Sequence, residues 1–419
     1  MDYLTVGALW ARYGLDAEGW RDGILLRWRD GNVVACSPAP RPPADVDPAW
    51  RFDSHLLTPG LLNAHCHLDY SLLRGRLSGA AGFAAWLRQI LAARRGLDDS
   101  AAEPARAAAA AALDELIHDG VTEIWDVASF GWAVPLLRAR NVPAIIFREW
   151  IAPDPARAAA FDAWANATFT ESDPAPTDGI SPHAPYSVCA EGLRRADAWA
   201  RRHARPVAIH LAESPEEREL LLAGTGALWK LLSEIAGRDV AQTLGRGNSP
   251  IARAEEAGLI RPETLAIHAN LPEPGEPERL ARVGCRVVFC PRSHAFFGYP
   301  RYPLKTWRAA GVGLALGTDS LASNDRLSIR AEARSLVAAH GWLRPADALA
   351  CATGAWLGAA PPFGGRGRFT PGAPAHWALW KIAPPPASLP ADRCADDLAS
   401  QWLHGSAPLA ASSLLPPIH

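Results

Sequence analysis

The sequence predicts an α/β fold, a (β/α)8 TIM-like barrel with a small β-sandwich built from both termini. Short, almost continuously apolar runs alternate with longer amphipathic segments, a pattern typical of a buried parallel sheet covered by helices. Eight such units fit into roughly 300 residues, the size of a (β/α)8 barrel. The two ends of the chain break this pattern, which indicates a second domain.

The expected barrel strands all have an apolar body and a polar end. They cover residues 61–68, 122–129, 143–150, 179–186, 207–214, 264–271, 286–294 and 312–320. The stretch 101–120 between the first two strands predicts a helix that ends at Gly120, because glycine accepts the left-handed conformation that terminates helices.

The flanks contain short strand-like pieces, GILLRW and NVVACS near the N-terminus and HWALWKI near the C-terminus. Segments from opposite ends of a chain can pair into one sheet. We therefore expect a small β-sandwich domain from residues 1–55 and 361–419, and a (β/α)8 barrel from residues 56–360.

The composition excludes several classes of protein. With 49% hydrophobic and 21% charged residues, the composition of the 419-residue chain is that of a globular protein. A net charge of −2 gives no sign of the excess positive charge that binds nucleic acid or an anionic membrane. No N-terminal signal pattern and no run of roughly 18 apolar residues is present, so we expect a cytoplasmic protein. The seven cysteines are scattered without CxxC spacing, which suggests neither disulfides nor a cysteine zinc site.

The stretch LLNAHCHLDY (61–70) places His65 and His67 at the end of the first expected strand. Residues i and i+2 of a strand project to the same side, so the two imidazoles could form half of a metal site. An isolated HxH pair is more often structural, and the rest of the chain has to decide. Cys66 between them should point away and pack.

Polar residues recur at the ends of the other expected strands, where barrel enzymes carry their catalytic groups. These residues are His183, His210, Glu213, His268 and Asp319. Histidine and carboxylate ligands suit zinc or iron, and a metal with one open position lowers the pKa of its water to roughly 7. The ligand set we choose is His65, His67, His210 and Asp319.

Hydrolysis also requires a group that moves protons. Glu213 lies three residues beyond His210 in HLAES and is our candidate general acid/base, although it could simply begin the next helix. His268 could hydrogen-bond the attacking hydroxide or the tetrahedral centre. Asp319 could take the proton of the water.

An ordered set of motifs carries a family resemblance: LTPGLLNAHCHLDYSLLRG, SPHAPYSV, HLAES, IHAN, CPRSH and GTDSLASND. From about residue 56 to 360 the chain resembles the amidohydrolase superfamily, in particular the aminohydrolase and chlorohydrolase branch with its S-adenosylhomocysteine, adenosine-type and aminodeoxyfutalosine deaminases. The resemblance implies one divalent metal ion, zinc or else iron, held by the four ligands above. Binuclear members use a lysine on a middle strand, and this chain has no lysine before Lys230.

The resemblance also suggests substrate contacts. His183 corresponds to a substrate-binding histidine, and Arg148 in FREW resembles a substrate-binding arginine, with a salt bridge to Glu149 as the alternative. Arg94 and Arg95 stand where adenosylhomocysteine-type enzymes carry an acidic residue for the ribose. They could meet an acidic substrate or simply be solvated.

A second departure from the family pattern lies in CPRSHAFFGYP. His294 replaces the usual asparagine. Phe296 and Phe297 could stack on a heteroaromatic ring or belong to the core.

Together these features predict a metal-dependent deaminase of a heteroaromatic amine, with a 6-aminopurine nucleoside-like small molecule of the aminodeoxyfutalosine or adenosine type as substrate. A guanine or cytosine deaminase, or a triazine-type chlorohydrolase, would use the same metal site. A barrel that binds a ligand without catalysis is the alternative from another class. The resemblance is compatible with a homodimer, although the sequence does not locate an interface.

Overall fold

A computed structural model describes residues 6–16, 18–95, 102–140, 142–169, 178–244, 247–385 and 390–412. The chain divides into two compact units. One consists of Met1–Ala64, Leu113–Ile124 and Ser328–His419, and the other of His65–Ala112 and Trp125–Leu327. The predicted domain boundaries at residues 55/56 and 360/361 stay a prediction.

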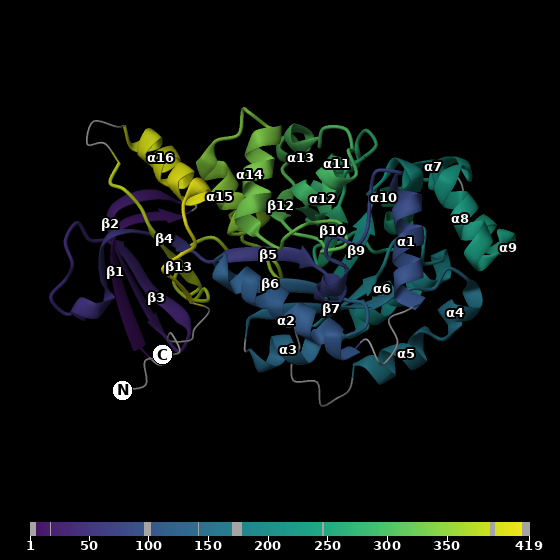
Figure 1. Ribbon diagram of the computed structural model, residues 1–419, viewed down its shortest axis with the longest axis horizontal. Helices are drawn as coiled ribbons and strands as arrows, with labels where there is room; N and C mark the ends of the chain where they lie inside the picture. Colours follow the sequence, from purple (N-terminus) through teal and green to yellow (C-terminus); the bar gives the residue numbers. More distant parts are fainter. Residues whose placement is uncertain are drawn as a thin grey trace. The chain divides into compact units, whose positions relative to one another are not determined.

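Eight parallel strands form one sheet in the order β12-β11-β10-β9-β8-β7-β6-β5 (Figure 1). They are β5 (Leu61–Cys66), β6 (Val121–Ala128), β7 (Ala144–Trp150), β8 (Gly179–Pro182), β9 (Val207–Leu211), β10 (Thr264–His268), β11 (Arg286–Phe289) and β12 (Gly313–Leu316). A parallel bridge between Cys66 and Asp319 links the two ends of the sheet, which is therefore a nearly closed barrel. The predicted (β/α)8 fold is confirmed.

Apart from β6, which begins one residue early at Val121, each strand lies inside its predicted range, and all of them except β7 end earlier than expected. Ala212 and Asp319 adopt positive φ angles of 48° and 56°, which extended backbone does not tolerate. The polar residues lie at these strand ends, with His65, His210 and His268 in the last two residues of β5, β9 and β10 and the others in the loops that follow. The apolar body of each strand is buried.

Helices connect the strands, and the predicted helix at 101–120 is confirmed as α2, which ends before Gly120 at φ 94°. The longer helices are α1 (Phe83–Arg95), α2 (Ala102–His118), α6 (Ala190–Arg202), α7 (Pro215–Ala223), α8 (Gly226–Ala236), α11 (Glu276–Val283), α14 (Ile329–Ala339), α15 (Pro345–Ala352) and α16 (Ala391–His404). The shorter ones are α3 (Val134–Ala139), α4 (Pro155–Ala159), α5 (Phe161–Thr168), α9 (Arg238–Thr243), α10 (Pro250–Glu256), α12 (Pro291–Phe296), α13 (Leu304–Ala310) and the 3-10 turns η1 (Pro48–Trp50), η2 (Leu68–Leu73) and η4 (Ala355–Leu357). In the described ranges, every helix is too short or too polar to cross a bilayer.

A separate six-stranded sheet combines both ends of the chain in the order β14-β13-β4-β1-β2-β3. Its strands are β1 (Val6–Asp16), β2 (Gly19–Arg29), β3 (Asn32–Pro38), β4 (Arg51–Pro59), β13 (Trp377–Lys381) and β14 (Ala410–Ser412). The C-terminal strand β13, yellow in Figure 1, pairs antiparallel with β4. Tryptophans 28, 50 and 377 pack together on this sheet with ring centroids 5.8–6.3 Å apart, which gives it a core of its own.

Candidate metal centre and active site

Five of the predicted residues converge at the carboxyl ends of the barrel strands. His65, His67 and Asp319 form one group and His65, His210 and His268 another, with one potential ligand atom from each residue within 4.8 Å of the others in its group. All five side chains are buried. The structure thus brings together the residues that the sequence analysis selected, with His268 also within reach.

Two of the imidazoles have their protonation pattern fixed by backbone carbonyls. His67 Nδ1 lies 3.1 Å from the carbonyl oxygen of Val127, and His210 Nδ1 lies 2.9 Å from that of His183. Because a carbonyl only accepts, both Nδ1 atoms carry the proton and both Nε2 atoms keep a lone pair. The two Nε2 atoms nevertheless lie only 3.2 Å apart.

Two lone pairs that face each other at this distance repel unless a cation lies between them. Nitrogen ligands about 2.0–2.1 Å from a tetrahedral zinc are about 3.3 Å apart, close to the separation found here. His65 adds a second indication, because neither of its buried ring nitrogens has a hydrogen-bond partner among the described residues. The donor set therefore fits a divalent metal ion.

Burial also keeps the imidazoles neutral, as metal ligands must be. It lowers the pKa of His67 to about 3, with the neighbouring His65 adding to the effect. Burial lowers the pKa of His268 to about 3, and burial together with His183 holds the pKa of His210 well below its ordinary value.

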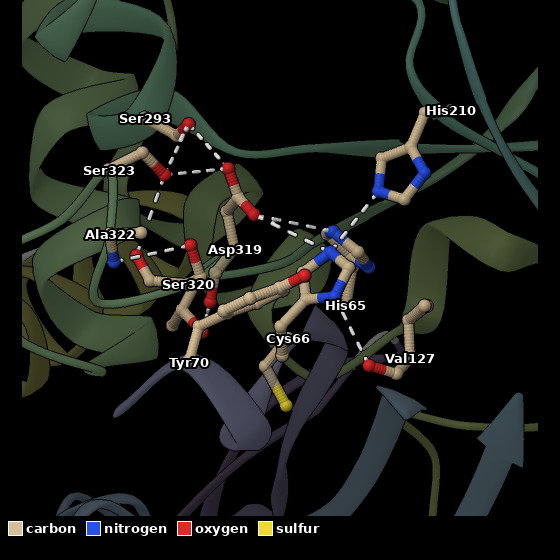
Figure 2. A network of polar contacts seen from close by, with 12 residues as sticks. His65, Cys66, Tyr70, Val127, His210, Ser293, Asp319, Ser320, Ala322 and Ser323 are labelled. Atoms are coloured by element: carbon tan, nitrogen blue, oxygen red, sulfur yellow. Dashed lines mark hydrogen bonds and ion pairs between the residues drawn. The ribbon is translucent and has the colours of Figure 1, made fainter. Parts of the chain in front are cut away.

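Asp319 is held by two serines, as Figure 2 shows. Ser293 Oγ and Ser323 Oγ both donate to Asp319 Oδ2, at 2.6 and 2.8 Å. The other oxygen, Oδ1, faces His65 Nε2 at 3.6 Å and His67 Nε2 at 3.9 Å. Burial opposes ionisation of Asp319, but His65 and His268 outweigh it and hold the pKa of Asp319 well below its ordinary value.

Glu213 lies just past β9, and side chains from elsewhere fix its backbone. Its N–H donates to Glu217 Oε2 at 2.7 Å, and its carbonyl accepts from Asn270 Nδ2 at 2.8 Å. Its carboxyl Oε1 lies 3.6 Å from His268 Nε2. Burial and the nearby Asp319 raise the pKa of Glu213 well above its ordinary value, which favours the protonated form of this carboxyl group.

A cavity of about 300 Å³ opens onto these groups. One part of its wall is polar and the other, built largely by α1 and α8, is apolar. The lining residues are His67, Tyr70, Phe83, Trp86, Leu87, Ile90, Leu91, Arg94, Glu149, Ile151, Pro153, Arg157, His183, Tyr186, Ser187, His210, Glu213, Leu232, Ile235, Ala236, His268, Asp319 and Ser320. The cavity has the size and mixed lining of a small-molecule site.

The structure separates the two predicted substrate contacts. His183 lines the cavity, with its Nδ1 hydrogen-bonded to Ser187 Oγ at 2.6 Å. Arg148 does not line it, and its guanidinium lies beside Gly131. The neighbouring Glu149, which the sequence analysis considered only as a salt-bridge partner, lines the cavity instead.

The sequence analysis did not decide whether five further residues contact the substrate, and the structure places one of them in the wall of the cavity. Arg94 lines the cavity, whereas Arg95, His294, Phe296 and Phe297 do not. Phe297 packs edge-on against Trp86 with ring centroids 5.2 Å apart. His294 Nε2 donates to the carbonyl oxygen of Pro300 at 2.7 Å.

Several supporting residues were missed, namely Glu149, Glu217, Asn270, Ser293 and Ser323. Most lie inside the motifs quoted above, IHAN, CPRSH and GTDSLASND, and Glu217 lies three residues after the end of HLAES. These motifs were the available signal, but the sequence does not show which residue each side chain contacts.

Similar proteins carry related names. An aminodeoxyfutalosine deaminase of Deinococcus radiodurans is 30% identical over 294 residues, which are 66% of this chain and 66% of that enzyme. A 5-methylthioadenosine/S-adenosylhomocysteine deaminase of Halobacterium salinarum is 32% identical over 328 residues, 75% of this chain and 68% of that enzyme. The matches thus span about two thirds of these relatives.

Solved structures show the same fold. Helicobacter pylori aminofutalosine deaminase in complex with methylthio-coformycin superposes with a TM-score of 0.82 at 18% identity, over 97% of this chain and 98% of that one. A zinc-bound adenosine deaminase of Xanthomonas campestris gives 0.74 at 23% identity, over 98% and 94% of the two chains. The model of the amidohydrolase family matches residues 56–402. This match confirms the predicted family and the prediction that the protein is a hydrolytic enzyme. The chain belongs to the amidohydrolase family.

Proposed function

We propose that this protein is a metal-dependent hydrolytic deaminase that releases ammonia from a 6-aminopurine nucleoside-like compound. The observation that carries the proposal is the pair of Nε2 lone pairs, on His67 and His210, that meet at 3.2 Å in the same cavity as Glu213, a carboxyl group whose pKa is raised by burial. The names of the relatives from Deinococcus and Halobacterium support an adenine-type nucleoside.

His65, His67, His210 and Asp319 would hold one divalent metal, with zinc favoured by the donor set and by the zinc-bound Xanthomonas structure, and iron as the alternative. When bound, such a metal acts as a Lewis acid and activates a water for attack at neutral pH. Asp319 Oδ1 is free of the two serines and is ionised, so it can accept the proton of that water.

Glu213 provides the opposite function. Burial raises the pKa of its carboxyl group, which favours the protonated form, and that form can give its proton to the amino nitrogen that leaves the ring as ammonia. Glu217 and Asn270 fix the backbone of Glu213, which holds the base of its side chain in place at the cavity. His268 Nε2 lies within 3.6 Å of Glu213 Oε1 and can position the attacking water.

The remaining cavity wall would receive the rest of the substrate. His183 presents its ring toward Glu149, with Nε2 4.0 Å from Oε1, and α1 and α8 contribute an apolar wall suited to an uncharged group. A guanine or cytosine deaminase or a triazine-type chlorohydrolase would use the same polar groups, and a non-catalytic binder remains the alternative from another class. The cytoplasmic location and the homodimer stay predictions.

The test is ammonia release from adenosine, methylthioadenosine, aminodeoxyfutalosine, guanine, cytosine and an aminotriazine. A chelated sample and a metal-reloaded sample are measured beside the native one. We expect turnover of a purine nucleoside that the chelator abolishes and that added zinc restores. Protein with stoichiometric metal that releases ammonia from none of these compounds would overturn the deaminase.

A further inference from the structure

We propose that Asp126, a buried carboxylate of β6, is a positioning residue that holds His67 in the direction required of a metal ligand. The inference rests on the metal site of the proposed function and deepens it. It assigns a role to a side chain that belongs neither to the two ligand groups nor to the wall of the cavity.

The end of β5 is attached to two consecutive residues of β6. Asp126 Oδ1 accepts a hydrogen bond from the N–H of Leu68 at 2.9 Å and contacts the Sγ of Cys66 at 3.5 Å. His67 lies between these two residues in the chain, and its Nδ1 donates to the carbonyl oxygen of Val127 at 3.1 Å. One carboxylate oxygen therefore holds both chain neighbours of a metal ligand, and the next residue of β6 holds the imidazole.

Contacts with both neighbours fix the backbone of His67. This residue has φ −127° and ψ 88°, and the peptide unit that ψ orients is the one whose N–H Asp126 accepts. A rotation of that peptide unit would turn the Cα–Cβ bond, and with it the imidazole, relative to β6. Metal–ligand distances hold to within about 0.2 Å, so a small rotation is enough to weaken coordination by His67 Nε2.

Asp126 is an unfavourable residue for a position that only has to be filled. In Figure 2 the sulfur of Cys66, which contacts Asp126, is directed away from Asp319. Asp126 is fully buried on that side, and its second oxygen, Oδ2, has no hydrogen-bond partner among the described residues. A buried carboxylate oxygen without a partner is unfavourable, and an apolar side chain avoids this cost. The contacts of Oδ1 give the carboxylate a role that filling space does not.

Asp69 provides an independent link between the same two segments. It lies in η2, directly after β5, and its Oδ2 accepts the N–H groups of Phe130 and Gly131 at 2.7 and 2.8 Å. Its Oδ1 accepts the N–H of Ala133 at 3.0 Å. The chain after β5 therefore stays attached to the chain after β6 when Asp126 is replaced. Such a replacement should alter the direction of the imidazole without releasing the segment.

The experiment measures the affinity of the metal-free protein for zinc by competition with a chelator. The visible absorption spectrum of the cobalt(II)-loaded protein is recorded as well, because it reports the coordination geometry. Asp126→Leu has the same branching as the native side chain but offers no acceptor. Asp126→Asn keeps one acceptor oxygen for the N–H of Leu68 and removes the charge.

Two controls match these changes. Asp178 is an equally buried aspartate directly before β8, at the opposite end of the barrel strands, and pairs with Arg138 at 2.7 Å. Asp178→Leu therefore tests the loss of a buried carboxylate far from the metal groups. Glu255→Gln removes a charge from α10, where Glu255 pairs with Arg279 of α11 at 3.0 Å. The melting temperature of the metal-free form is measured for each protein.

We expect Asp126→Leu to bind zinc at least about tenfold more weakly than the native protein and to change the cobalt spectrum. Groups that orient a metal-binding histidine typically contribute 10- to 100-fold to affinity. Asp126→Asn should stay within about threefold of the native affinity, with the native spectrum. Both controls should keep the native affinity, although Asp178→Leu should melt at a lower temperature.

Three outcomes would overturn the proposal. One is native affinity in Asp126→Leu. Another is an equal loss in Asp126→Asn, because the charge and not the acceptor would then matter. The third is an equal loss in Asp178→Leu, because metal affinity would then follow stability. If Asp126→Leu does not fold, Asp126→Val, which also suits a strand and lacks an acceptor, replaces it with the same expected loss.

Failure of the proposed function has a different signature. The deaminase fails if the metal-loaded protein releases ammonia from none of the compounds named above, and the zinc affinities still decide the role of Asp126. A native protein that binds neither zinc nor iron would overturn both proposals.

Discussion

Each compact unit contains a cavity lined by charged groups. The two cavities differ in whether these groups have strong hydrogen-bond or ion-pair partners. The cavity of about 300 Å³ in the barrel unit contains Glu149 and Glu213, which lack strong partners, and imidazole lone pairs that face one another. The cavity of about 430 Å³ in the other unit is lined by Glu123 and Arg366, which pair with each other.

The pairing in the larger cavity is nearly complete. Arg366 Nε and Nη2 donate to the two carboxylate oxygens of Glu123 at 2.8 and 2.6 Å, and Nη1 donates to the carbonyl oxygens of Pro362 and Gly364. A guanidinium with these contacts has little left for a ligand. The comparison teaches that unsatisfied polar groups, and not cavity size, distinguish a reactive site from a structural one.

The largest effect should come from Glu213→Gln, which removes the proton donor of the smaller cavity. We expect kcat to fall by about 10²- to 10⁴-fold, since this is the usual contribution of a positioned acid. Metal content, measured by emission spectrometry, should equal that of the native enzyme and of the control Glu255→Gln. Loss of metal in Glu213→Gln would make Glu213 a ligand and contradict its role as proton donor.

Arg366→Met tests whether the ion pair in the larger cavity contributes to stability and not to activity. It removes the guanidinium that forms the ion pair with the buried Glu123, and we expect the free energy of unfolding to fall by about 3 kcal/mol. Chemical denaturation measures this loss, and kcat/KM per folded molecule should stay within about twofold of the native value. The double variant Glu123→Gln/Arg366→Met, which removes both charges, should recover part of the stability. A large loss of activity in the folded single variant would show that the larger cavity also takes part in function.

The buried carboxyl group of Glu217 should make the free energy of unfolding depend on pH. Burial raises its pKa to about 8, although the backbone N–H groups of Glu213 and Ser214 oppose the shift. Because the folded-state pKa is above the unfolded value of about 4.3, the stabilisation is complete below pH 4 and is lost as the pH rises to 8. Relative to Glu217→Gln, the native enzyme should lose on the order of 4 kcal/mol of unfolding free energy between pH 5 and 8. Parallel stability curves for the two proteins would contradict this assignment.

The strand ends explain how much of this site could be predicted from the sequence. Catalytic residues of barrels follow apolar strands, so His65, His210 and Asp319 stood out in the sequence although they lie far apart along the chain. The exact strand ends did not, because left-handed residues such as Ala212, directly after β9, end the strand for reasons of local geometry.

Orientation was harder to predict than position. Arg148 and Glu149 are adjacent on β7 and point to opposite sides, and since both are polar, the pattern cannot tell which one lines the cavity. The tautomers of His67 and His210 depend on carbonyls of Val127 and His183 that only the folded sheet brings near.

The smallest effect concerns the serines that hold Asp319. Ser293→Ala and Ser323→Ala each remove one hydroxyl from Asp319 Oδ2 without touching Oδ1, the oxygen directed toward the histidines. Groups that orient a ligand in this way typically contribute 10- to 100-fold to metal affinity, and since two hydroxyls share the task, we expect about tenfold for each variant. Competition with a chelator measures the affinity, with Ser233→Ala as a control whose hydroxyl bonds only within α8. Because each serine also donates to the same oxygen as the other, the double variant should lose more than the product of the single losses. Unchanged affinity in both single variants would mean that Asp319 is oriented by its left-handed backbone alone.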